Sequence, residues 1–159
     1  PNIKNVSEFI SIRNACYLPP RGVRSVGYSR ANLFGKKFVG YKKEKATPIL
    51  IAMIVNISSV KNLEKLLLVK GLDAILIGPY DLSASMNITG KFNHPKFKSV
   101  LNTINKLSKR YKIPCGIHII EPKYKILKKY IKQKYQFLPY STDAVLLNTA
   151  LKQSFNQKL

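Results

Sequence analysis

The sequence predicts an α/β fold in which a parallel sheet is covered by helices. Apolar runs without polar alternation recur at 48–55, 73–78, 113–120 and 135–141, and such runs are typical of strands buried on both faces. Segments with helical spacing of apolar residues separate these runs. With 159 residues, of which 45% are hydrophobic, the chain is long enough for one cored domain spanning 1–159.

The first predicted element is a helix over 6–16, where apolar residues recur at helical spacing. The segment "YLPPRG" ends this helix, because Pro lacks an N–H donor and fixes φ. A loop containing Gly and Arg follows, with a short helix predicted near 28–34. The run "PILIAMIV" at 48–55 is bounded by Pro48 and predicts the first strand.

The remaining elements alternate between helix and strand. We expect Ser58 or Ser59 to cap the next helix, and Pro95 suits the first turn of the long one. The predicted order is a helix at 59–70, a strand at 73–78, a helix at 93–111, a strand at 113–120, a helix at 122–133, a strand at 135–141 and a helix at 143–153.

Polar residues stand where the predicted strands end. Right-handed crossovers leave two architectures, an open doubly wound sheet or part of a (β/α) barrel, and both bind ligands at the C-terminal ends of strands. No Gly-rich phosphate-binding loop follows any strand, which weakens the dinucleotide-binding form of the open sheet. Asp81 follows "ILIGPY", and His118 lies in "GIHII". Asp81 suits either a helix cap or a ligand to a hard cation. His118 suits a pocket residue better than a general base.

The chain is strongly basic, with 28 Lys and Arg against seven Asp and Glu and a formal net charge of +21. The lysines are spread along the sequence, and no helix-turn-helix, zinc-finger or RRM signature accompanies them. We therefore expect a solvated surface with weak, salt-sensitive attraction to polyanions and no dedicated nucleic-acid site. The longest apolar run, 49–55, is too short to cross a bilayer. With no leader pattern, and with Cys16 and Cys115 far apart, we expect a cytoplasmic protein without a membrane segment.

Several stretches together carry a family resemblance: "YLPPRGVRSVGYSRANLFG", "GLDAILIGPYDLSAS" followed by "HPKF", "IPCGIHIIEP" and "YQFLPYSTDAVLL". They resemble the HpcH/HpaI aldolase family of the pyruvate/phosphoenolpyruvate barrel superfamily. The resemblance implies the C-terminal portion of a (β/α)8 TIM-type barrel, with about four parallel strands and covering helices. Because a full barrel takes about 250 residues and the chain starts "PNIKN" without Met, we expect a fragment that lacks the N-terminal strands and the catalytic residues they carry.

The resemblance also implies a chemistry, the lyase reaction of a class II aldolase on pyruvate-derived 2-keto hydroxy acids. In such an enzyme a divalent metal, Mg²⁺ or Mn²⁺, holds the keto acid and stabilises its enolate. Asp81 corresponds to a metal ligand of the family. Gly78, Pro79, Tyr80 and His118 correspond to positions that line the substrate site. Homo-oligomers are a further implication, with the terminal helix packing on a neighbouring copy.

One departure from the family pattern bears directly on the metal. The preceding strand of the family ends in a Gln-x-Glu motif whose Glu is the second metal ligand, and these positions are Met53 and Val55 here. A valine offers no lone pair. We therefore expect no activity from this chain alone. Three readings remain: part of a metal-dependent aldolase, a non-catalytic remnant acting as a subunit or interaction module, and a basic polyanion-binding protein.

Overall fold

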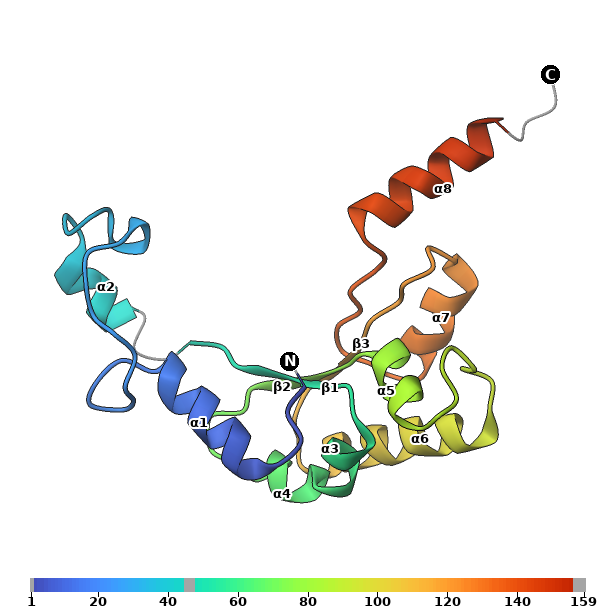
Figure 1. Ribbon diagram of the computed structural model, residues 1–159, viewed down its shortest axis with the longest axis horizontal. Coiled ribbons are helices and arrows are strands. Elements are labelled where there is room, and N and C mark those ends of the chain that lie inside the picture. The colour runs from blue at the N-terminus through green and yellow to red at the C-terminus, as the bar shows by residue number, and fades with distance from the viewer. Residues whose placement is uncertain (1, 45–47, 156–159) are drawn as a thin grey trace.

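The sheet at the centre of the fold is parallel and has three strands in the order β1-β2-β3. The computed structural model describes residues 2–44 and 48–155 (Figure 1). In the sheet, Ile54 pairs with Ile77, and Ile77 pairs with Ile117. The carboxyl ends of all three strands therefore meet at one edge. The strands are β1 at Ile51–Ile54, β2 at Ala74–Ile77 and β3 at Cys115–Ile117.

Helices cover one face of this sheet. In Figure 1, α1, α3, α4 and α6 lie on one side of the strands, whereas α2 and α8 project from the other side as two arms. The helices are α1 at Val6–Cys16, α2 at Phe38–Glu44, α3 at Ile57–Lys61, α4 at Leu63–Leu67, α5 at Pro79–Ser85, α6 at Pro95–Arg110, α7 at Tyr124–Lys132 and α8 at Asp143–Phe155.

The predicted helices are confirmed with several differences, and α5 was not among the predicted elements. The helix expected at 59–70 is two short helices, α3 and α4, and Asn56 caps the first of them by accepting from the Ser58 N–H at 2.9 Å. The short helix expected near 28–34 is a 3-10 helix at Arg30–Asn32. Helix α2 was not predicted, because "FVGYKKE" shows no apolar period of 3.6 and contains a glycine.

The fourth predicted strand, 135–141, does not form a regular strand in the structure. This segment runs parallel beside β3, but only two isolated bridges join them, Gly116 to Phe137 and Ile119 to Tyr140. The Pro139 carbonyl accepts from the Ile119 N–H at 2.9 Å. Proline has no N–H of its own, so Pro139 cannot donate a ladder hydrogen bond back to β3. Consecutive ladder pairs therefore do not form, and the described sheet has three strands where about four were expected.

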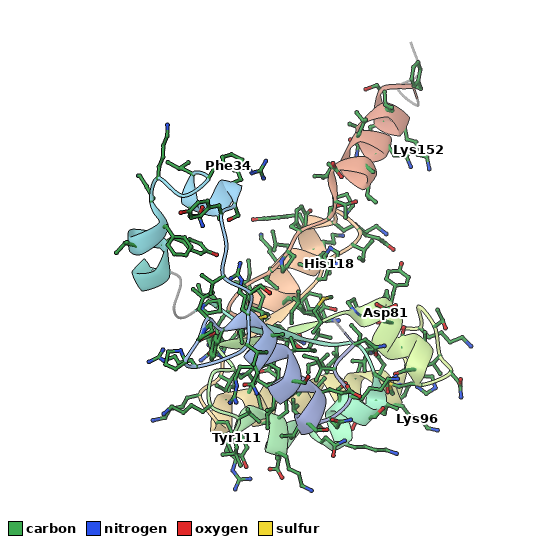
Figure 2. All side chains as sticks on the ribbon, turned by 60° about the vertical axis from the view of Figure 1, so that its left-hand side comes forward. Phe34, Asp81, Lys96, Tyr111, His118 and Lys152 are labelled. Atoms are coloured by element: carbon green, nitrogen blue, oxygen red, sulfur yellow. The ribbon has the colours of Figure 1, made fainter. Side chains whose placement is uncertain are left out.

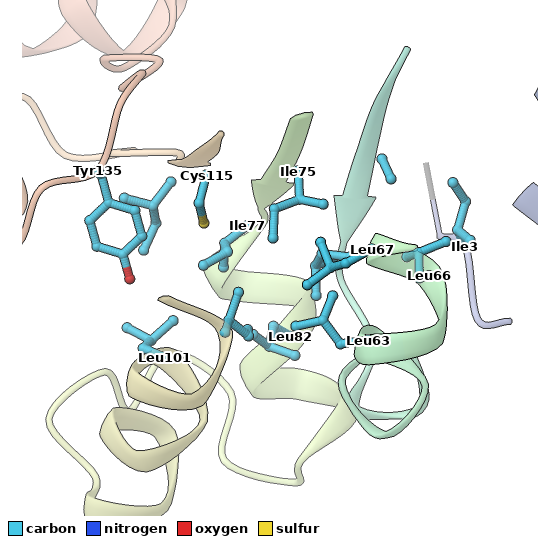
Figure 3. Packing of buried hydrophobic residues seen from close by; sticks show 14 of the residues in the cluster. Ile3, Leu63, Leu66, Leu67, Ile75, Ile77, Leu82, Leu101, Cys115 and Tyr135 are labelled. Atoms are coloured by element: carbon cyan, nitrogen blue, oxygen red, sulfur yellow. The ribbon is translucent and has the colours of Figure 1, made fainter. Parts of the chain in front are cut away.

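The core lies between the sheet and its helices, and Figure 3 shows part of it. Ile75 and Ile77 of β2 contribute to this cluster, and Phe97 and Ile104 of α6 pack with them, all fully buried. The opposite face of the sheet carries no helix, and Ile51 there is 47% exposed. Alternate strand residues point to opposite faces, so the same strands are buried on one side and partly open on the other.

Helix α8 contributes no buried residue to this core. Its Leu147, Leu151 and Phe155 are exposed and recur every four residues, on one side of the helix. Among the described residues, no helix combines the length and apolar character needed to cross a bilayer.

Candidate functional site

The turn after β2 places Asp81 at the carboxyl edge of the sheet. Helix α5 begins with Pro79 at its first position, and Gly78 precedes it in an extended conformation. Pro is favoured at this position because its fixed φ suits the helix start. Asp81 therefore lies inside the first turn of α5, and its exposed carboxylate has no hydrogen bond or ion pair among the described residues. Asp81 therefore does not cap α5, because Gly78 occupies the N-cap position.

The backbone amides of this turn differ in what they can offer a ligand. The Gly78 N–H donates to the Ile54 carbonyl at 3.2 Å, within the parallel sheet. Pro79 has no N–H. Helical hydrogen bonding resumes where the Leu82 N–H donates to the Gly78 carbonyl at 3.0 Å. The amides of Tyr80 and Asp81 thus remain as the donors of the first turn that the helix itself does not use.

Asp81 faces Val55 across Gly78. A Cβ built on Gly78 would lie 2.8 Å from Val55 Cγ1 and 3.8 Å from Asp81 Oδ2. Both side chains line one groove of about 450 Å³, together with Met53, Asn56 and Ser85. The end of β1 therefore puts position 55, not position 56, next to the Asp81 carboxylate. Figure 2 shows Asp81 on this edge of the molecule and His118 across from it.

The oxygen donors of this groove do not fit a divalent metal. The Asn56 side-chain oxygen already accepts from the Ser58 N–H. Ser85 Oγ donates to the Leu82 carbonyl at 2.7 Å and accepts from the Ile57 N–H at 2.9 Å. Within residues 2–44 and 48–155, no group of three His, Cys, Asp or Glu side chains could hold a metal. Asp81 alone supplies a free carboxylate, whereas Ca²⁺ and Mg²⁺ take six or more oxygen ligands.

His118 lies in a different hollow from Asp81. A cavity of about 240 Å³ between α5 and α7 is lined by Pro79, Tyr80, Phe92 and His118, with Lys129 also contributing. Tyr80 packs edge-on against Phe92, with ring centroids 4.9 Å apart. The predicted metal ligand is thus separated from three of the residues predicted to line the substrate site. Pro79, Tyr80 and His118 share this mostly apolar cavity, whereas Asp81 lines the groove beside Val55.

Ser141 is a neighbour of His118 that the sequence analysis did not identify. The His118 Nε2 lies 3.4 Å from the Ser141 carbonyl oxygen. Ser141 has a φ of 63°, a left-handed conformation that favours glycine. Its hydroxyl is buried without a hydrogen-bond partner among the described residues. No local sequence signal announces this contact, because residues 118 and 141 meet only through parallel pairing of their segments.

The cysteines offer no reactive thiol at this edge. Burial raises the pKa of the Cys115 thiol to about 12, so it stays protonated at neutral pH. Cys115 is buried and Cys16 is half-buried, and both are free thiols. Neither cysteine contributes to the candidate site.

These features define a class of protein: a segment of a parallel (β/α) barrel whose candidate site lies at the carboxyl ends of its strands. The chain belongs to the HpcH/HpaI aldolase/citrate lyase family, whose sequence profile matches residues 1–149. The predicted family is thus confirmed.

Known relatives are similar to this chain but longer than it. A crystal structure of a family member from Burkholderia cenocepacia J2315 superposes with a TM-score of 0.91 at 23% identity, over 99% of this chain and 62% of that one. A 5-keto-4-deoxy-D-glucarate aldolase from Enterobacter sp. (strain 638) is 26% identical over 96% of this chain and 59% of the enzyme. A hydroxypyruvate/pyruvate aldolase from Roseobacter denitrificans is 34% identical over 68% of this chain and 43% of the enzyme. The chain therefore spans about three fifths or less of these relatives.

Proposed function

We propose that this chain contributes the Asp81 turn and His118 to a 2-keto acid site of the aldolase type, and that by itself it performs no aldol chemistry. Relatives bearing the names of a hydroxypyruvate/pyruvate aldolase and a 5-keto-4-deoxy-D-glucarate aldolase support the class of substrate. The observation that carries the proposal is the position of Val55, whose methyl groups occupy the groove opposite the Asp81 carboxylate.

The electrostatics of the groove support the expectation that this chain alone is inactive. A keto acid is an anion, and without a cation the Asp81 carboxylate repels it. The two unused amides of Tyr80 and Asp81 attract a carboxylate, but Asp81 stands in the same turn. Enolate formation needs a positive charge where the negative charge develops, and Asp81 and Val55 supply none. Substrate binding and proton abstraction therefore both lack their electrostatic partner.

The test is exchange of the methyl protons of pyruvate in D₂O with Mg²⁺ present, followed by NMR. We expect the chain to leave the exchange rate at the background value. Exchange above background that EDTA abolishes, and that Asp81→Asn also abolishes, would overturn the proposal. The Asp73→Asn variant is the matched control, because Asp73 lies at the start of β2, where it accepts from the Leu50 N–H at 2.6 Å and is remote from the carboxyl edge.

A role as a subunit is the second candidate, and helix α8 favours it. Leu147, Leu151 and Phe155 form an exposed apolar side of a helix that has one acid and one lysine, hence no net charge, in a chain of +21. A second copy of this chain is the proposed occupant, because the same face on two copies is self-complementary and the neutral helix limits repulsion.

The mass in solution tests this contact. We expect sedimentation to give an oligomer for the parent chain and a monomer for L147E/L151E. The control N148E/Q153E adds the same charge at exposed polar positions of α8 and should keep the parent mass. A monomeric parent, or an equal loss in both variants, would contradict the subunit role.

A further inference from the structure

Lysines that are separated in the sequence lie close together on the surface of α6 and α7. Between Leu82 and Thr142 the chain has thirteen Lys and Arg residues and a single acid, Glu121. Helices α6 and α7 contain no acid at all. They meet near their C-terminal ends, where the Asn105 side chain of α6 donates to the carbonyl of Gln133, just past α7, at 3.1 Å. Lysines that are far apart in sequence therefore face one another across the contact between two helices.

A groove of about 480 Å³ runs between the C-terminal ends of these helices. Asn102, Lys106 and Lys109 line it from α6, and Lys132 and Lys134 line it from the end of α7 and the residues just after it. We call these residues the lysine groove. A neighbouring groove of about 440 Å³ along α7 is lined by Lys125, Lys128, Lys129, Lys132 and Gln133.

In the part of the chain that the structure describes, no carboxylate forms an ion pair with these lysines. The two ion pairs among the described residues join Arg110 to Glu64 at 3.5 Å and Lys123 to Glu121 at 2.5 Å. Neither pair includes a lysine of the groove, and the lining contains no acid. Like charges held this close repel one another, so an anion that enters the groove relieves repulsion as well as gaining attraction.

We propose that the lysine groove binds the phosphate backbone of a single-stranded nucleic acid. Lysine ammonium groups and side-chain amides are donors that proteins use for phosphate oxygens. A linear chain of phosphates can enter a groove between two helices. A membrane surface is flat, so it would contact only the lysines on the rims of the groove. The neighbouring groove leads along α7 toward Tyr124 at the start of that helix. Tyr124 is 63% exposed, with Lys128 Nζ 4.7 Å from its ring centroid, and it offers a face on which a base can stack.

The lysine groove is distinct from the candidate aldolase site. Helix α6 ends at Arg110, shortly before β3 begins at Cys115, and α7 ends at Lys132, shortly before the segment that pairs with β3. The groove therefore lies toward the amino end of β3, opposite the edge that bears Asp81. Its occupant does not depend on a metal or keto acid, and the test below is independent of aldolase activity.

The experiment measures fluorescence anisotropy of a labelled single-stranded RNA of about 20 nucleotides with the full chain, between about 50 and 200 mM KCl. The groove variant K106Q/K109Q/K132Q/K134Q is compared with K4Q/K61Q/K65Q/K70Q, whose lysines are also exposed. Each set removes four positive charges. We expect the groove variant to bind at least about tenfold more weakly than the control, and its salt slope to fall by about 2 to 3, near 0.7 for each lost phosphate contact.

Two results would overturn the proposal. One is an equal loss of affinity in both variants, which would mean that the net charge attracts RNA without a defined site. The other is binding to vesicles containing phosphatidylserine with no binding to the RNA, which would assign the surface to anionic lipid. Urea denaturation of both variants establishes that each retains the parent fold.

Discussion

Replacing Val55 by Glu is expected to strengthen the weak Mn²⁺ binding of the parent chain by about a hundredfold. The new carboxylate would stand in the groove opposite Asp81, since Val55 Cγ1 and Asp81 Oδ2 flank the same point above Gly78. Affinity of a hard cation rises with the number of charged oxygen ligands. Isothermal titration calorimetry with Mn²⁺, with and without pyruvate, measures the gain.

Two further variants separate a metal site from a general change in charge. V55Q has the length of the glutamate side chain without its charge and should gain little. V55E/D81N retains the new carboxylate and removes the old one, so it should lose most of the gain. A gain in V55Q equal to that in V55E would show that the new carboxylate charge is not needed. A gain that survives Asp81→Asn would show that Asp81 does not take part. Tight binding by the parent would mean that another ligand replaces the missing glutamate.

Truncating Phe97 to Ala is expected to lower the free energy of unfolding by about 3–5 kcal/mol, a large part of the 5–15 kcal/mol typical of a domain. Phe97 is fully buried in the core beneath the sheet. Its ring also contacts Phe92, with centroids 5.6 Å apart, and Phe92 contacts Tyr80. The cavity left by Phe97→Ala therefore removes support from the loop that forms one wall of the His118 cavity. Urea denaturation followed by circular dichroism measures the loss.

Phe34→Ala is the control for this truncation. It deletes the same atoms, but Phe34 is 72% exposed on the arm that projects from the sheet (Figure 2). We expect its unfolding free energy to stay within about 0.5 kcal/mol of the parent, as for surface substitutions. Comparable losses in the two variants would mean that Phe34 is covered in solution, for instance by a second copy.

Most secondary structure could be predicted because it depends on local patterns. The helix at 6–16 has the same bounds in the structure, and α6 begins at Pro95 with His94 accepting from the Lys96 N–H at 3.2 Å. The fourth strand could not be predicted reliably, because an apolar run does not reveal whether its neighbour offers matching donors. The proline at 139 was visible in the sequence, and it is the signal that argued against a regular strand.

The residues of the candidate site could be predicted from the sequence. Their separation into a groove with Asp81 and a cavity with His118 could not. The position of Asp81 after an apolar run, together with the family motif, placed it at the carboxyl edge, and counting along the motif placed Val55 next to it. That His118 lies in a separate cavity with Tyr80, and that Ser141 adopts a left-handed conformation beside it, depends on how strands and loops meet. Residues 80, 118 and 141 belong to three different segments, and no periodicity relates them.

The sequence by itself determined the class of fold, the family and the presence of Val55 rather than an acid at the end of the first strand, because each depends on residue type and spacing along the chain. Only the tertiary structure decided which surfaces those residues form. Lysines that read as scattered along 106–134 converge because α6 and α7 pack in contact. Side-chain charge is set by composition, but an electric field at a surface depends on distances through space, which the fold alone defines.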